Sequence, residues 1–122
     1  MPSHMRAALL AVATLCLAFG DGHYFAIKEG NEKFRNKDYK GALELYKKAN
    51  GQKDSAVSRY DMGNAQYWLG DYNAAAEAYG GAVNSPDADL AKRAALNYAN
   101  AKTSLAMEKM EKGPEPTARE DL

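Results

Sequence analysis

The sequence predicts an all-α protein built from an internal repeat, and two observations support this fold class. Residues 30–49 and 63–82 match at an offset of 33 residues, with eight identical pairs in 20 positions, where composition alone gives about one or two. In both segments small and aromatic residues recur every three or four positions, as on one face of a helix. A fixed period of this length is typical of stacked helix pairs, so we expect a short helical solenoid.

The matching residues define a motif. They are Gly30, Asn31, Asp38, Tyr39, Ala42, Glu44, Tyr46 and Ala49, repeated as Gly63, Asn64, Asp71, Tyr72, Ala75, Glu77, Tyr79 and Ala82. A glycine, an Asp-Tyr pair, and then alanine, tyrosine and alanine resemble the tetratricopeptide repeat (TPR), a helix-turn-helix unit of about 34 residues. The resemblance implies a right-handed solenoid of two TPR units, at residues 23–53 and 54–85, and a capping helix at residues 86–112.

Start and stop signals place the individual helices. We expect helices over residues 24–36, 38–50, 55–69, 71–83 and 86–112. Either Asp54 or Ser55 caps the third helix. Ser85-Pro86-Asp87 starts the last one, and Gly113-Pro114 ends it. Residues 113–122 are charged and rich in proline, so we expect them to form a disordered tail.

Gly80 and Gly81 interrupt the expected fourth helix. Glycine inside a helix costs about 0.5 to 1 kcal/mol relative to alanine. From the spacing of the repeat we expect both glycines to face solvent, away from Ala75, Tyr79 and Ala82. The alternative is that their missing side chains let another backbone come close, such as the capping helix or a partner.

A candidate signal peptide covers residues 1–20. Arg6 precedes a mostly apolar run without charged residues, residues 7–19, which ends at a small-x-small cleavage site, Ala18-Phe19-Gly20. The run is shorter than the roughly 20 residues that span a bilayer. We therefore expect export to the periplasm, with no stable membrane span after cleavage. Residues 1–4 are either native or a cloning remnant.

Two alternatives to a cleaved signal remain. An uncleaved signal, or a lipid attached to Cys16, would anchor the chain to the membrane, but Leu15 is larger than the residue that lipid attachment favours at that position. An amphipathic or buried first helix is less consistent with residues 7–19, because this run has no polar face.

The charge balance and the scarcity of metal-binding residues exclude several function classes. Sixteen basic residues balance sixteen acidic ones, so no net field attracts nucleic acid. Cys16 is the only cysteine, and His4 and His23 have no second ligand at metal-binding spacing. The sequence contains no phosphate-binding glycine loop and no catalytic triad. We therefore expect no enzyme activity, no metal and no cofactor.

The TPR resemblance implies a ligand-binding groove on the first helix of each pair. The positions are Ile27, Asn31, Phe34, Arg35, Tyr60, Asn64, Tyr67, Trp68, Arg93, Leu96 and Asn100. Asparagine can pair with a peptide backbone through both amide groups, and exposed aromatic residues dominate binding energy at interfaces. The alternative for Tyr67 and Trp68 is that they cover the seam between repeats. Ile27 and Leu96 occupy positions where clamps for a terminal carboxylate carry cations, so we do not expect that ligand class.

These features favour a protein-binding scaffold or adaptor in the bacterial envelope. A weaker resemblance, to exported repeat proteins of the Bat aerotolerance operons, rests on the signal sequence, the two repeats, residues 96–99 and the proline-rich tail. The alternative is a self-assembling subunit, because two repeats are fewer than the three or so that a solenoid needs and uncovered faces could pair between chains. An envelope enzyme or small-ligand carrier is the least favoured class.

Overall fold

The computed structural model describes residues 22–114 of the chain. The expected signal peptide and cloning remnant lie outside the described residues, as does most of the expected tail, residues 115–122. The described part consists of five helices and contains no strand, which confirms the all-α prediction. None of its helices is long and apolar enough to cross a membrane.

The helices lie close to their predicted ranges. The first occupies residues 22–35 of the described chain. It is followed by α2 (Tyr39–Gln52), α3 (Ala56–Trp68), α4 (Tyr72–Gly80) and α5 (Ala88–Lys112). α2 continues past the predicted stop at residues 50–51, whereas α5 ends where predicted, at Gly113, whose φ of +71° suits a residue without a side chain.

The two Asp-Tyr pairs act as helix starts. Oδ1 of Asp38 accepts a hydrogen bond from the backbone N–H of Gly41 at 2.9 Å, and Oδ1 of Asp71 accepts from Ala74 at 3.2 Å. Each bond satisfies one of the N–H groups that have no partner in the first helical turn. The turn motif of the repeat therefore fixes where α2 and α4 begin.

For α3 and α5 the sequence left more than one candidate capping residue, and the structure shows which one caps each helix. Ser55 caps α3, because its Oγ accepts from the N–H of Ser58 at 3.1 Å. Asp87 caps α5, while Ser85 accepts from the N–H of Asp87 at 3.1 Å. α5 therefore begins at Ala88, slightly later than predicted.

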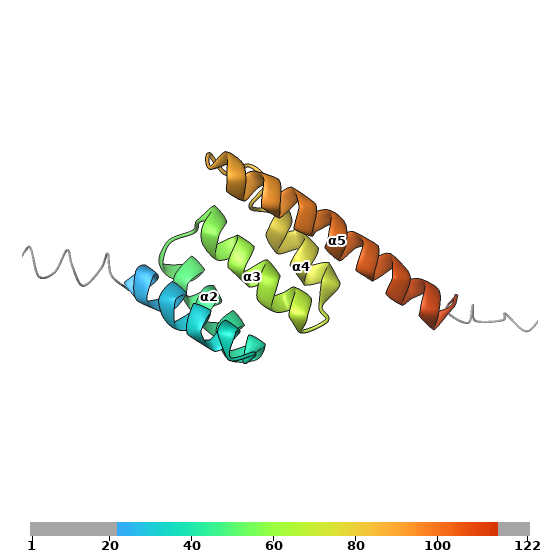
Figure 1. Ribbon diagram of the computed structural model, residues 1–122, viewed down its shortest axis with the longest axis horizontal. Coiled ribbons are helices and arrows are strands. Elements are labelled where there is room, and N and C mark those ends of the chain that lie inside the picture. Colours follow the sequence, from blue (N-terminus) through green and yellow to red (C-terminus); the bar gives the residue numbers. More distant parts are fainter. Residues whose placement is uncertain (1–21, 115–122) are drawn as a thin grey trace, which may run out of the picture.

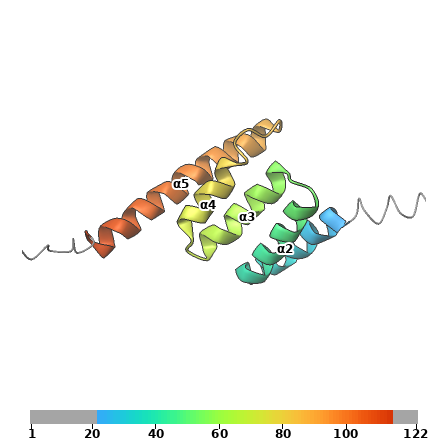
Figure 2. The same ribbon diagram turned by 180° about the vertical axis from the view of Figure 1, so that it is seen from behind.

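Consecutive helices lie side by side and are joined by short turns. Figure 1 shows the first helix and α2 at one end, α3 in the middle, and α4 and α5 at the other end. The view from behind shows the same order (Figure 2). α5 is much longer than α4, on which it mainly packs.

The core consists of small residues around two tyrosines that are almost fully buried. One cluster contains Ala42, Tyr46 and Ala65, and the other contains Ala75, Ala76, Tyr79 and Ala101. Alanine lets neighbouring helices approach closely, and each tyrosine ring supplies a large apolar area. The core therefore depends on two rings held between closely packed helices.

The same contact occurs in both copies of the repeat. A tyrosine from the second helix lies over the glycine of the first helix and donates its hydroxyl to the next asparagine, at 2.7 Å in both copies. The two sets are Gly30, Asn31 and Tyr46, and Gly63, Asn64 and Tyr79. A Cβ atom added to either glycine would lie 2.6 or 2.7 Å from the tyrosine ring, so both positions require a residue without a side chain.

The expectation for Gly80 and Gly81 is wrong. α4 ends at Gly80, and both glycines are partly buried. A Cβ on Gly81 would lie 2.8 Å from the Arg59 side chain, and one on Gly80 would lie 3.7 Å from the Tyr98 ring. The contacts come from side chains of α3 and α5, so the alternative is closer to the structure: the capping helix lies beside Gly80, although through a side chain and not its backbone.

Candidate functional site

A pocket of about 220 Å³ opens between α3 and α5, with a side chain of α4 in its wall. It is lined by Asn64, Tyr67, Trp68, Tyr79, Asn97 and Asn100. Tyr79 is only 2% exposed, whereas Trp68 is 62% exposed. The pocket thus brings together four of the groove residues expected from the sequence: Asn64, Tyr67, Trp68 and Asn100.

The amide of Asn64 is held in one orientation. Its Oδ1 accepts the hydrogen bond from the Tyr79 hydroxyl at 2.7 Å. Burial, with smaller effects from Tyr60 and Tyr67, raises the pKa of Tyr79 well above its usual value, so this hydroxyl stays protonated and donates. The Nδ2 group of Asn64 has no partner among the described residues and remains available as a donor.

The amide of Asn97 is held the other way round: its Nδ2 group is used and, within the described residues, its Oδ1 is free. Its Nδ2 donates to the Tyr60 hydroxyl at 3.1 Å, and the Tyr60 and Tyr79 rings lie 5.7 Å apart between their centroids. Oδ1 of Asn97 has no donor among residues 22–114. The walls of the pocket therefore present a donor from α3 and an acceptor from α5.

Tyr67 and Trp68 play different parts in the pocket wall. Tyr67 packs against the buried cluster of α4 and α5, and its hydroxyl lies 3.1 Å from Oγ of Ser104. It therefore covers a seam as well as lining the pocket. Trp68 stacks on Tyr39, with ring centroids 5.7 Å apart and an angle of 13° between the planes, while most of its surface remains exposed.

The other predicted groove residues do not line this pocket. Ile27 and Phe34 are partly buried against the cluster around Tyr46, and Asn31 accepts the Tyr46 hydroxyl. Tyr60, on α3, accepts a hydrogen bond from Nδ2 of Asn97. The last three are exposed: Arg35, Arg93 and Leu96.

Asn97 is a lining residue that the groove prediction missed. It follows Asn64 by 33 residues, the same offset that separates Asn31 from Asn64. This offset could be seen in the sequence and points to Asn97, whereas the groove prediction included Leu96 and Asn100 from the same helix. Tyr79 was also absent from the set, because its position in the repeat is structural.

Comparison with known proteins gives no match to a family model, a curated protein or a solved structure. The TPR resemblance therefore rests on the residues of this chain alone.

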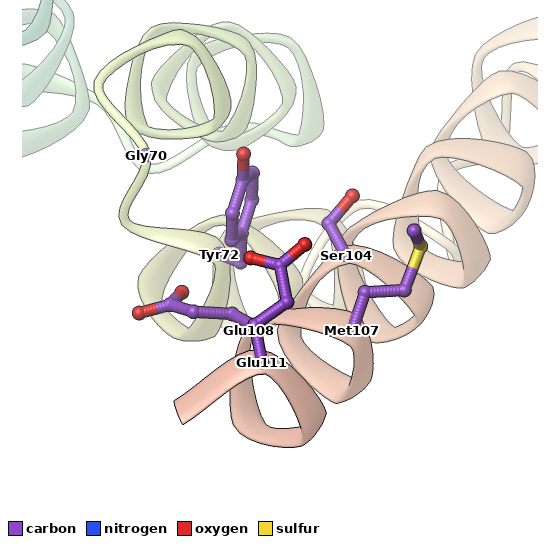
Figure 3. Close-up of a pocket in the computed structure, with 6 residues that line it drawn as sticks. All are labelled: Gly70, Tyr72, Ser104, Met107, Glu108 and Glu111. Atoms are coloured by element: carbon purple, nitrogen blue, oxygen red, sulfur yellow. The ribbon is translucent and has the colours of Figure 1, made fainter. Parts of the chain in front are cut away.

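A second and more open pocket, of about 410 Å³, lies where α4 begins. Figure 3 shows Gly70 and Tyr72 on one side and Ser104, Met107, Glu108 and Glu111 of α5 on the other. Glu108 forms an ion pair with Lys112, one helical turn further along. Within residues 22–114 no group of three or more histidine, cysteine, aspartate or glutamate side chains is arranged to hold a metal ion.

Proposed function

We propose that this chain is a TPR-type protein-binding module, in which two helix pairs and a capping helix form a short right-handed solenoid. The proposal is supported by the glycine, asparagine and tyrosine contact that recurs in both copies. In such a solenoid the first helix of each pair lines the inner face. α3 and α5 contribute five of the six lining residues of the pocket.

The observation that carries this proposal is the match between the free amide groups and a peptide unit. A peptide unit offers one N–H donor and one C=O acceptor. Nδ2 of Asn64 can donate to the carbonyl, and Oδ1 of Asn97 can accept from the N–H. Asn100 offers both groups, and the exposed Trp68 ring offers apolar area for a ligand side chain. The pocket is thus suited to the backbone of an extended or helical ligand segment.

The lining of the pocket favours binding over catalysis. It consists of asparagine and aromatic side chains and includes no carboxylate, imidazole or thiol, so it offers no general base or strong nucleophile. The site of action that we propose is the bacterial envelope, on the basis of the signal-like residues 1–20.

Selection from a random peptide library displayed on phage tests this function. The full-length chain should enrich for a common set of peptides, whose affinities are then measured with purified protein. We expect the double variant Trp68→Ala, Asn100→Ala to bind these peptides at least about tenfold more weakly, because tryptophan is a typical hot-spot residue and the variant also loses the hydrogen bonds of one amide.

Leu96→Ala is the matched control for this experiment. Leu96 is 63% exposed, about as much as Trp68, and lies on the same helix as Asn100 but outside the pocket. Its removal should leave affinity within about twofold, less than the effect of a typical hot-spot residue. Equal losses in the control and the double variant would contradict the proposed site, and a library that yields no peptide would contradict the function.

Self-assembly is the second candidate function, and a specific observation favours it. Leu96 follows Gly63 by one repeat length, and in both repeats the residue at this position is covered by a tyrosine from the next helix. Leu96 has no such cover in the described structure and is largely exposed. Met107 and Met110 of α5 are also exposed, so a second copy could cover this surface.

A further inference from the structure

Asp61 is a partly buried acidic residue that the proposed peptide site does not yet use. It lies on α3 one helical turn before Asn64, about 4.5 Å away along the helix axis. Its carboxylate forms no hydrogen bond or ion pair with any described residue. Burial raises the pKa of this carboxyl to about 6, so at neutral pH it is ionised and lacks a compensating partner.

The charge of Asp61 acts on the Tyr46 hydroxyl of α2, as does the charge of Arg35 from the first helix. Burial raises the pKa of the Tyr46 hydroxyl, the charge of Asp61 raises it further, and Arg35 lowers it. The hydroxyl of Tyr46 is already used, since it donates to Asn31. Arg35 is exposed and takes part in none of the ion pairs of residues 22–114. Burial alone raises the pKa of Asp61, and no cation of the described residues offsets it.

An ionised carboxylate without a partner is costly to desolvate, and a ligand that covers it increases the cost unless the ligand supplies a cation. A neutral group would leave the charge uncompensated, and an anionic group would be repelled. An ammonium or guanidinium group would donate short, charge-assisted hydrogen bonds. The ligand chemistry that fits this position is therefore cationic.

We propose that Asp61 binds the lysine or arginine side chain of a peptide whose backbone is held by Asn64 and Asn97. This inference rests on the proposed peptide-binding function and specifies the charge of the ligand. An extended chain advances about 3.3 to 3.6 Å per residue. The basic residue should therefore lie one or two positions from the peptide unit that contacts Asn64.

Selection of peptides from the same displayed library, with the full-length chain and with Asp61→Asn, tests the proposal. We expect lysine or arginine to be enriched at one fixed position in peptides selected by the wild type and not in those selected by the variant. A wild-type peptide in which this residue is replaced by glutamine should bind the wild type at least about tenfold more weakly. The same replacement should change binding to Asp61→Asn by less than about twofold.

A pH profile gives a second measurement that does not depend on the folding of a variant. Protonation of Asp61 removes the partner of the cation, so affinity for the basic peptide should fall as pH decreases from about 7.5 to about 5. Lysine and arginine remain charged throughout this range. The affinity of Asp61→Asn should stay flat across the same interval.

The outcomes separate this inference from the function on which it rests. Peptides that depend on Trp68 and Asn100 but show no basic position would overturn the assignment to Asp61 and leave the peptide-binding function intact. An equal effect of the glutamine replacement on wild type and Asp61→Asn would also overturn it. A library that yields no peptide would overturn both proposals.

Discussion

At Gly63 the absence of a side chain decides how closely α3 and α4 can pack. The ring of Tyr79 occupies the space where a Cβ atom would lie, 2.7 Å from its Cδ1 and Cε1 atoms. The ring cannot move away freely, because its hydroxyl is bound to Asn64 and its surface lies in the core. Asn64 and Tyr79 also line the pocket, so Gly63 supports the candidate site as well as the fold.

Gly63→Ala should therefore destabilise the protein by about 1 to 3 kcal/mol, the usual cost of an extra methyl group in a packed interior. Gly51→Ala is the matched control, because its added Cβ would meet no atom of the described structure within 4 Å. We expect the control to stabilise α2 by up to about 1 kcal/mol. Urea denaturation measures both effects, and equal midpoints for the two variants would contradict the close contact at Gly63.

Asp61 also makes stability depend on pH. Its pKa is about 6 in the folded protein and 3.8 in its reference state. Between these values the folded chain holds a proton that the unfolded chain has lost, so stability falls as pH rises through this window. The loss of stability caused by burying the ionised carboxylate is fully present above pH 6 and absent below the reference pKa.

Asp61→Asn removes this cost. We expect the variant to be more stable than the wild type at about pH 8, by about 1 to 3 kcal/mol once partial exposure is allowed for. The difference should disappear near pH 3. Thermal denaturation of both proteins across this range provides the measurement, and a difference that does not change with pH would show that the carboxylate is not desolvated by folding.

At the scale of elements, the end of α4 depends on its neighbours. Gly80 is the last residue of the helix, and a Cβ there would make an ordinary contact with Tyr98 of α5. At Gly81 the added atom would meet the side chain of Arg59, which forms an ion pair with Asp54. The two glycines therefore differ in what surrounds them.

Gly80→Ala should raise the free energy of unfolding by about 0.5 to 1 kcal/mol, because it adds a contact and reduces the freedom of the unfolded chain. Gly81→Ala should give no such gain, since Arg59 must move away from its pair with Asp54. Chemical denaturation of the two single variants tests the difference. Equal stabilisation by both would mean that the Arg59 side chain moves without cost.

At the scale of the whole molecule, exposed apolar side chains occur on both outer helices as well as on α3, where Val57 and Trp68 are exposed. Tyr24 and Phe25 are exposed on the first helix, and Leu96, Met107 and Met110 are exposed on α5. Apolar surface gathered on an outer helix is typical of contact sites. The two outer helices are therefore the surfaces where a second copy could bind.

If the chain self-assembles, its mass in sedimentation equilibrium should rise with concentration from the micromolar to the millimolar range. The double variant Leu96→Glu, Met107→Glu should then remain a monomer, because each change places a charge on the contact surface. Lys92→Glu, also on the exposed part of α5, controls for the change in charge. A wild-type mass that is independent of concentration would exclude self-assembly.

Several residues of the candidate site could be predicted from the sequence, but not which amide groups are free to donate or accept a hydrogen bond. The repeat register placed Asn64, Tyr67 and Trp68 on one helix face, and these three residues line the pocket. The sequence could not show that the Tyr79 hydroxyl occupies Oδ1 of Asn64, so the expectation that both amide groups are free holds only in part. That bond joins residues on different helices, and its existence depends on how α3 and α4 pack.

The sequence by itself determined the features that depend on neighbouring residues. Caps at Asp38 and Asp71 and the stop at Gly113 act within one helical turn, so local chemistry specified the helices and the all-α class. Only the tertiary structure decided which groups meet across helices. The bond from Asn97 to Tyr60 and the burial of Asp61 depend on the distances and angles between packed helices, and short-range sequence patterns do not encode these.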